Sequence, residues 1–150
     1  MMIDAGSVKT LEFNARFGDP ECQPLLMRRK SDIVPVLLAV ADGDISGITL
    51  EWHDQAAVCV VMAAGGYPGD YRKGDVISGL DDAGRSDDLV VFHAGTKLVD
   101  GRFVTNGGRV LGVTALGATV GEAIEKAYKG VAGIGWDKVQ FRTDIGKKAL

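Results

Sequence analysis

Cysteine and histidine are scarce in this sequence, and their scarcity limits the chemistry that it can carry. The 150 residues include two cysteines, Cys22 and Cys59, and two histidines, His53 and His93. Without a C-x-x-C pair, the sequence predicts neither a thiol redox motif nor a cysteine zinc site, and we expect free thiols in a reducing cytoplasm. The two histidines are too far apart in the sequence to indicate a shared metal site.

Long apolar runs, a secretion signal and a surplus of positive charge are also lacking. No uninterrupted apolar stretch approaches the length of a membrane span, so no membrane partner is expected. The N-terminus has no basic region followed by an apolar core and a cleavage site, which favours a cytoplasmic location. The formal net charge is −3, which argues against a nucleic-acid partner bound through its phosphates.

The stretch from Leu11 to Glu21 carries the densest polar chemistry in the chain. Its alternation predicts a strand from Val8 to Phe17, with Glu12, Asn14 and Arg16 on one face. Carboxylate and amide oxygens that face the same way suit Mg²⁺ held beside phosphates, and a guanidinium suits an anion. The same spacing equally fits a half-buried strand with a solvated polar face, and the spacing alone does not decide between the two.

The same stretch, continued to Glu21, carries a family resemblance. The run Glu-Phe-Asn-Ala-Arg-Phe-Gly-Asp-Pro-Glu at 12–21 resembles the metal-binding strand of an ATP-grasp ligase that continues into the Arg-Phe-Gly-Asp-Pro-Glu signature of the glycinamide ribonucleotide synthetase family. Four later segments agree with this family: Gly65–Tyr71, Phe92–Thr96, Thr105–Leu111 and Asp144–Gly146. The resemblance covers nearly the whole chain but matches only the C-terminal part of such a ligase.

The resemblance implies an ATP-dependent ligase of de novo purine biosynthesis. Such an enzyme joins glycine to 5-phosphoribosylamine through a glycyl phosphate, with ATP as co-substrate. By matching position, Glu12 and Asn14 would hold Mg²⁺ or Mn²⁺ that bridges the ATP phosphates. Arg16 would be catalytic and stabilise the transferred phosphoryl group. Asp19 would help to orient the amine substrate.

A second candidate site is the turn Gly107-Gly108-Arg109. Consecutive glycine amides beside a positive charge can form an anion-binding nest. We expect this turn to bind the 5-phosphate of the ribosyl substrate, although a loop with a surface arginine fits the same residues equally well. The reaction requires no covalent nucleophile, and we assign none.

The apolar patterns predict an α+β fold. One helix is expected with Asp19 as N-cap and Pro20 as its first residue, and another after the N-cap Ser31, ending before Gly43. A further set of elements follows: a buried strand at 57–64, short strands at 76–77, 89–93, 109–115 and 139–141, an acidic loop at 81–88, a hairpin turning at 100–101, and an amphipathic helix at 120–132 capped by Thr119.

We expect two parts in this chain. Residues 1–47 are predicted to be the C-terminal remnant of an ATP-grasp domain, a strand plus helices. Residues 48–150 are predicted to form a small sandwich of mainly antiparallel sheet and one main helix.

The segments that grip ATP in this family, and its N-terminal lobe, have no counterpart here. We therefore expect a C-terminal portion that is inactive alone, with the missing lobes on the same gene or on another chain. Two alternatives stay open: another ATP-grasp carboxylate–amine ligase, or a non-catalytic binding module that retains only the C-terminal fold.

Overall fold

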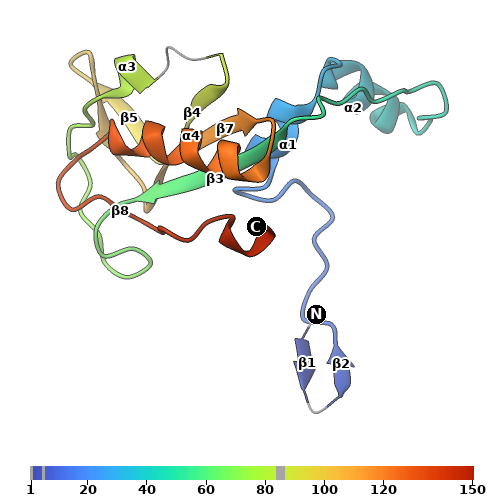
Figure 1. Cartoon of the computed structure of the whole chain (residues 1–150), viewed down its shortest axis with the longest axis horizontal. Helices are drawn as coiled ribbons and strands as arrows, with labels where there is room; N and C mark the ends of the chain where they lie inside the picture. The colour runs from blue at the N-terminus through green and yellow to red at the C-terminus, as the bar shows by residue number, and fades with distance from the viewer. Residues whose placement is uncertain (1, 5, 84–86) are drawn as a thin grey trace.

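The computed structural model describes residues 2–4, 6–83 and 87–150. The strands are β1 (Met2–Asp4), β2 (Ser7–Lys9), β3 (Ala56–Ala63), β4 (Leu89–His93), β5 (Thr96–Val99), β6 (Arg102–Thr105), β7 (Arg109–Gly117) and β8 (Gln140–Phe141). The helices are α1 (Cys22–Arg28), α2 (Ile33–Asp42), α3 (Leu80–Ala83), α4 (Val120–Ala132) and the 3-10 turn η1 (Lys147–Ala149). Figure 1 shows one body of sheet and helix, from which two segments project in different directions. One is the N-terminal arm, by which we mean the described residues before α1, and the other is α2.

The body is built on a four-stranded antiparallel sheet in the order β4-β7-β3-β8. The two long strands lie side by side, with Val60 opposite Val113 and Cys59 opposite Thr114. Because side chains alternate along a strand, Val60 points to one face of the sheet and Cys59 to the other. The prediction of an α+β fold with an antiparallel sheet is confirmed.

Helix α4 covers one face of this sheet. Its apolar stripe, Ala123, Ala127 and Val131, is buried in the same core as Val60 and Val113. The helix begins after Thr119, whose Oγ1 accepts a hydrogen bond from the Glu122 amide at 3.2 Å, while Glu122 Oε2 accepts one from the Ala118 amide at 2.9 Å. The main helix predicted at 120–132 is therefore confirmed.

Helix α1 packs on the opposite face. Its Gln23 lies over Gly112 of β7, with Nε2 3.8 Å from the position that a Cβ would take there, and Cys59 of β3 borders the same point. Helix α4 thus lies across one face of the sheet, and the shorter α1 lies on the other (Figure 1).

The predicted hairpin is confirmed, and its turn has the expected backbone. Asp100 has φ 48° and Gly101 has φ 75°, the left-handed values that a type I′ turn requires at both positions. The predicted strand at 76–77 is wrong, since Val76 forms only an isolated bridge to Val104. Within the predicted acidic loop, residues up to 83 belong to α3, and residues 84–86 lie outside the described residues.

The predicted strand from Val8 to Phe17 is wrong over most of its length. Only Ser7–Lys9 is a strand, paired with β1, and residues 10–18 belong to no helix or strand. A strand needs a neighbour to exchange backbone hydrogen bonds with, and no described residues pair with this stretch beyond Lys9.

The predicted N-caps of the first two helices are also wrong. Helix α1 begins at Cys22 after Glu21, because the Asp19 carboxylate is bound elsewhere, by Gln23 at 3.1 Å and by an arginine of β7. Helix α2 is capped by Asp32, which accepts from the Val34 amide at 3.0 Å, one residue after the predicted Ser31. Its predicted end is confirmed at Gly43, with φ 79°.

None of the helices in the described residues has the length and apolar character that crossing a bilayer requires.

Lys126 links α4 to the start of β4. Its Nζ lies 2.8 Å from Asp88 Oδ2 and 2.8 Å from Glu122 Oε1. The hydrogen bonds from Lys126 hold the pKa of both carboxyls below their ordinary values of 3.8 and 4.5. A carboxyl whose folded-state pKa is depressed stabilises the fold above its unfolded-state pKa, and this stabilisation is lost as the pH falls through the folded-state value.

We expect Lys126→Met to weaken the acid dependence of unfolding. The substitution removes the largest cause of both depressed pKa values, so the free energy of unfolding should fall less steeply below pH 4.5. At pH 7 the change should be small, because the pair is solvent-exposed. Urea unfolding across this pH range measures the free energy of unfolding at pH 7 and its fall in acid. Lys129→Met, on the same helix, is the control. Equal acid dependence in wild type and Lys126→Met would contradict the prediction.

Candidate functional site

A polar cavity of about 520 Å³ lies where residues 12–21 approach the start of β7. Its lining residues are Glu12, Asn14, Arg16, Phe17, Asp19, Glu21 and Arg109. The structure therefore brings together five of the residues predicted from the sequence, Glu12, Asn14, Arg16, Asp19 and Arg109. Two segments that are far apart in the sequence form this cavity.

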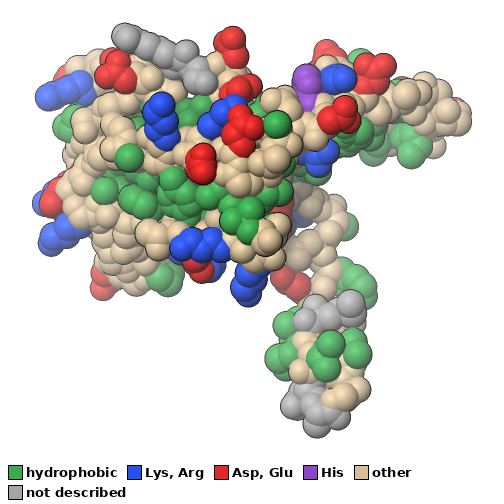
Figure 2. All heavy atoms as spheres, viewed as in Figure 1, with side chains coloured by type: hydrophobic (Ala, Val, Ile, Leu, Met, Phe, Trp, Pro, Cys, Tyr) green, Lys and Arg blue, Asp and Glu red, His purple; other side chains and the backbone are tan. Residues whose placement is uncertain are grey.

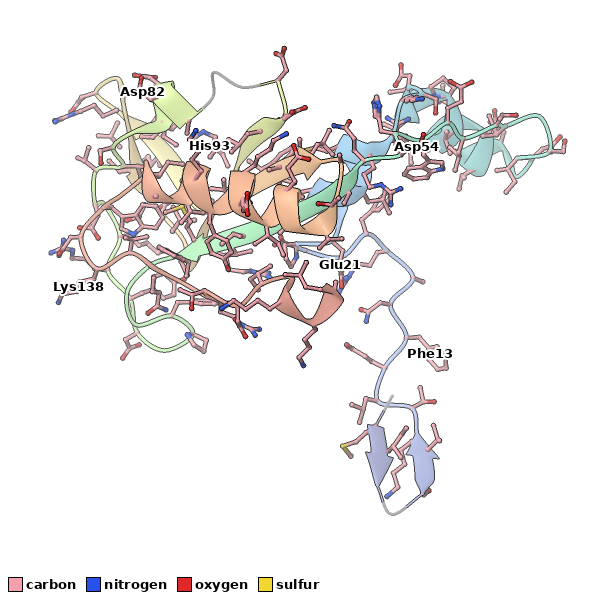
Figure 3. The ribbon with its side chains drawn as sticks, viewed as in Figure 1. Phe13, Glu21, Asp54, Asp82, His93 and Lys138 are labelled. Atoms are coloured by element: carbon pink, nitrogen blue, oxygen red, sulfur yellow. The ribbon has the colours of Figure 1, made fainter. Side chains whose placement is uncertain are left out.

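The side chains of Glu12 and Asn14 face the same way although they are not on a strand. Asn14 Nδ2 donates a hydrogen bond to Glu12 Oε1 at 3.2 Å, on the exposed arm that Figure 3 marks by Phe13. Carboxylate and amide oxygens are the ligands that Mg²⁺ and Mn²⁺ accept. Within the described residues, no group of three or more His, Cys, Asp or Glu side chains could hold a metal ion. A cation held by this pair would take most of its ligands from phosphates or water.

Arg109 ties the arm to the sheet. Its Nη1 donates to the Asp19 carbonyl oxygen at 3.0 Å, and its Nη2 lies 3.2 Å from Asp19 Oδ2. Both side chains are exposed in the cavity. The guanidinium has five N–H donors, and these two contacts leave others free to bind a ligand. The sequence did not predict this contact between Arg109 of β7 and Asp19.

Gly107 and Gly108 do not line the cavity, and close packing accounts for both residues. A Cβ at Gly108 would overlap the ring of Tyr67, and a Cβ at Gly107 would lie 2.9 Å from the Cα of Gly95. The Gly108 carbonyl also accepts from the Ala64 amide at 2.8 Å, which pins the turn to the end of β3. Their predicted role in phosphate binding stays a prediction.

Phe17 and Glu21 line the cavity as well, and sequence reasoning assigned neither to the site. The Glu21 carboxylate folds back over Gly18, where a Cβ would overlap it. The sequence pattern gave Glu21 no role beyond its place in the family signature. The signal that could have found it is its position in the run from Arg16 to Glu21, which includes three other lining residues, Arg16, Phe17 and Asp19.

An apolar groove of about 610 Å³ adjoins this cavity and shares Arg109 with it. Cys59, Val61 and Ala63 of β3 line it from the sheet face that α1 leaves open. Burial raises the pKa of the Cys59 thiol, which keeps it neutral and therefore a weak nucleophile.

Comparison with known proteins identifies one family. The family described as phosphoribosylglycinamide synthetase, C domain, matches residues 57–148.

Two relatives that match the whole chain have the same name. Phosphoribosylamine–glycine ligase of Escherichia coli K12 is 54% identical and that of Rhodopirellula baltica 52% identical, each over 100% of this chain and 35% of its own length. The chain thus spans about a third of the length of these curated relatives. The crystal structure of phosphoribosylamine–glycine ligase from Thermotoga maritima superposes with a TM-score of 0.77 and 34% identity, over 95% of this chain and 34% of that one.

We expect Gly108→Ala to destabilise the fold without any ligand present. The new Cβ would displace the Tyr67 ring, and overpacking of this kind costs about 1–3 kcal/mol. Urea unfolding measures the loss, and Tyr67→Ala should remove most of the difference between Gly and Ala at position 108. Gly47→Ala is the control, since nothing lies within 4 Å of a Cβ there. Equal stability of Gly108→Ala and wild type would show that this packing is not tight.

Proposed function

The chain belongs to the phosphoribosylglycinamide synthetase C-domain family, and we propose that it is the C-terminal part of an ATP-dependent ligase that joins glycine to 5-phosphoribosylamine. The product would be glycinamide ribonucleotide, in de novo purine biosynthesis. The observation that carries the proposal is the polar cavity, where Glu12, Asn14 and Arg16 of the arm meet Arg109 of β7. The names of the relatives support the same reaction.

The residues of the cavity have separate roles in this proposal. Glu12 and Asn14 would hold Mg²⁺ or Mn²⁺, which neutralises charge on the ATP phosphates when bound. Arg16 stabilises negative charge on the phosphoryl group as it passes from ATP to a carboxylate oxygen of glycine. This step gives ADP and glycyl phosphate.

The second step joins the amine. The nitrogen of 5-phosphoribosylamine attacks the carbonyl carbon of glycyl phosphate, inorganic phosphate leaves, and the nitrogen loses a proton. Asp19 would orient this amine, and Arg109 holds Asp19 in place through the contacts at 3.0 and 3.2 Å. The turn Gly107-Gly108-Arg109 would bind the 5-phosphate, using the guanidinium N–H groups that Asp19 leaves free.

The two predicted parts of the chain have distinct places in the proposal. Residues 1–47 would belong to an ATP-grasp domain and supply the metal ligands, and residues 48–150 would form the C-terminal domain. The groups that grip ATP would lie in the two thirds of the ligase that this chain does not match. We propose the cytoplasm as its compartment, in keeping with its two free cysteines.

We expect the 150-residue chain alone to release no ADP above background with ATP, glycine, 5-phosphoribosylamine and Mg²⁺. Fusion behind the part of the E. coli relative that precedes the matched region should restore turnover, because it supplies the ATP-gripping segments. A coupled assay of ADP release measures both, with the E. coli enzyme as positive control. Normal turnover by the chain alone, or a folded fusion with no turnover, would contradict the proposal.

We expect Glu12→Gln in that fusion to lower kcat by roughly 10²- to 10³-fold, as loss of one transition-state charge contact does. The Mg²⁺ concentration for half-maximal rate should also rise, because an amide is a weaker ligand than a carboxylate. Glu125→Gln, on the exposed side of α4, is the matched control and should change neither value. A loss of kcat with an unchanged Mg²⁺ dependence would remove Glu12 from the metal site.

A further inference from the structure

The Asp19 carboxylate is held from two sides. Arg109 Nη2 lies 3.2 Å from its Oδ2, and Gln23 Nε2 donates a hydrogen bond to its Oδ1 at 3.1 Å. Each oxygen thus has a donor of its own, one from β7 and the other from α1. Because a carboxylate has about four lone-pair sites, both oxygens can still accept a hydrogen bond from a ligand in the polar cavity.

Gln23 itself lies outside both cavities. It lines neither the polar cavity nor the apolar groove, whereas Asp19 lines the first and Arg109 lines both. Its side chain is half-buried between α1 and the sheet, over Gly112 of β7. Any effect of Gln23 on a reaction in the polar cavity would therefore pass through Asp19.

The Gln23 amide can point in only one direction without loss. Its N–H group faces Asp19, and its Oε1 is buried and accepts no hydrogen bond from any described residue. Turning the amide over would remove the hydrogen bond and face Oε1 toward the negatively charged Oδ1, which repels it. The orientation of Gln23 and that of the carboxylate are thus fixed together.

Gln23 and Arg109 differ in charge, and this difference separates what each can do for Asp19. Arg109 is positive, and the proposed function also assigns it to the 5-phosphate, which would compete with Asp19 for the guanidinium. The Gln23 amide is neutral, so it fixes the carboxylate without cancelling its negative charge. Gln23 can therefore hold Asp19 throughout the reaction.

We propose that Gln23 is a positioning residue for the second step of the ligase reaction, and that it holds Asp19 in the orientation that receives the amine of 5-phosphoribosylamine. The inference rests on the proposed function, from which it takes the role of Asp19. The nitrogen gains positive charge as it attacks glycyl phosphate, and a carboxylate already in place stabilises this charge.

The competing explanation is a purely structural one. Gln23 and Asp19 are four residues apart, so their hydrogen bond could serve only to stabilise the start of α1. A structural role would affect all substrates of the enzyme alike, whereas a positioning role affects the amine.

Gln23→Met tests the role in the fusion with the preceding part of the E. coli relative. Methionine keeps the length of the side chain and removes the N–H group. We expect kcat/KM for 5-phosphoribosylamine to fall roughly tenfold, as loss of a hydrogen bond to a charged group does. The KM values for ATP and glycine should be unchanged, because neither substrate is oriented by Asp19 in the proposed function.

Gln55→Met is the matched control. The Gln55 side chain also forms a hydrogen bond with an aspartate, Asp88, and is half-buried like that of Gln23. Asp88 contacts Lys126 of α4, where Figure 2 shows acidic and basic side chains next to one another, and it lines neither cavity. All three kinetic constants should therefore stay at their wild-type values, and urea unfolding of both variants shows that they are folded.

Gln23→Glu gives a readout that a structural role would not move. Two carboxylates at hydrogen-bond distance retain a shared proton to higher pH than one carboxylate does. A proton on Asp19 weakens its attraction for the amine, so the acid limb of the pH profile of kcat/KM for 5-phosphoribosylamine should move up by about one unit or more. In the Asp19→Asn background, which has no second carboxylate, Gln23→Glu should not move the limb.

Four results would overturn the inference: an unchanged kcat/KM for the amine in Gln23→Met, an equal loss for all three substrates, an acid limb that Gln23→Glu leaves in place, and a full further loss from Gln23→Met in the Asp19→Ala background. The last would show that Gln23 does not act through Asp19. A folded wild-type fusion without turnover would instead contradict the proposed function. The same substitutions at the aligned positions of the full-length E. coli enzyme would then test Gln23.

Discussion

The pairing of β3 with β7 is the interaction on which the rest of the structure depends. These strands carry apolar side chains on both faces, so one face binds α4 and the other binds α1, while β4 and β8 complete the edges. The register also sets the site. It places Arg109 opposite Ala63, after a shift in the ladder, where the guanidinium reaches Asp19. The contact between arm and body is therefore a consequence of strand register.

The elements that were predicted correctly from the sequence are those that neighbouring residues determine. Thr119 and Glu122 lie within one turn, and Asp100-Gly101 contains its own turn signal, so α4 and the hairpin were both predicted correctly. The errors arose where a distant residue decides the outcome. The strand predicted at 8–17 lacks a pairing partner among the described residues beyond Lys9, and Asp19 binds Arg109 instead of capping a helix. Neither partner can be found from spacing along the chain.

The candidate site shows the same division. Alternation along the arm correctly placed Glu12, Asn14 and Arg16 together, since an extended chain keeps its period of two without a neighbouring strand. The contribution of Glu21 depends on how the chain folds back at Gly18, which no alternation indicates. The Gly107-Gly108 pair has a packing reason, against Gly95 and Tyr67, that is independent of any phosphate. Two glycines in the sequence are compatible with close packing and with phosphate binding, so their presence alone could not decide between these two causes.

The separation of β3 and β7 along the chain has a consequence for the order of folding. Their pairing joins Ala63 to Arg109 and closes the loop between them. Closing this loop costs conformational entropy before burial of the core can offset that cost. The β5–β6 hairpin lies inside that loop and forms from neighbouring residues, so it shortens the flexible chain that remains to be closed. A tight turn at Asp100-Gly101, remote from the site, thereby acts on how quickly the site's sheet can assemble.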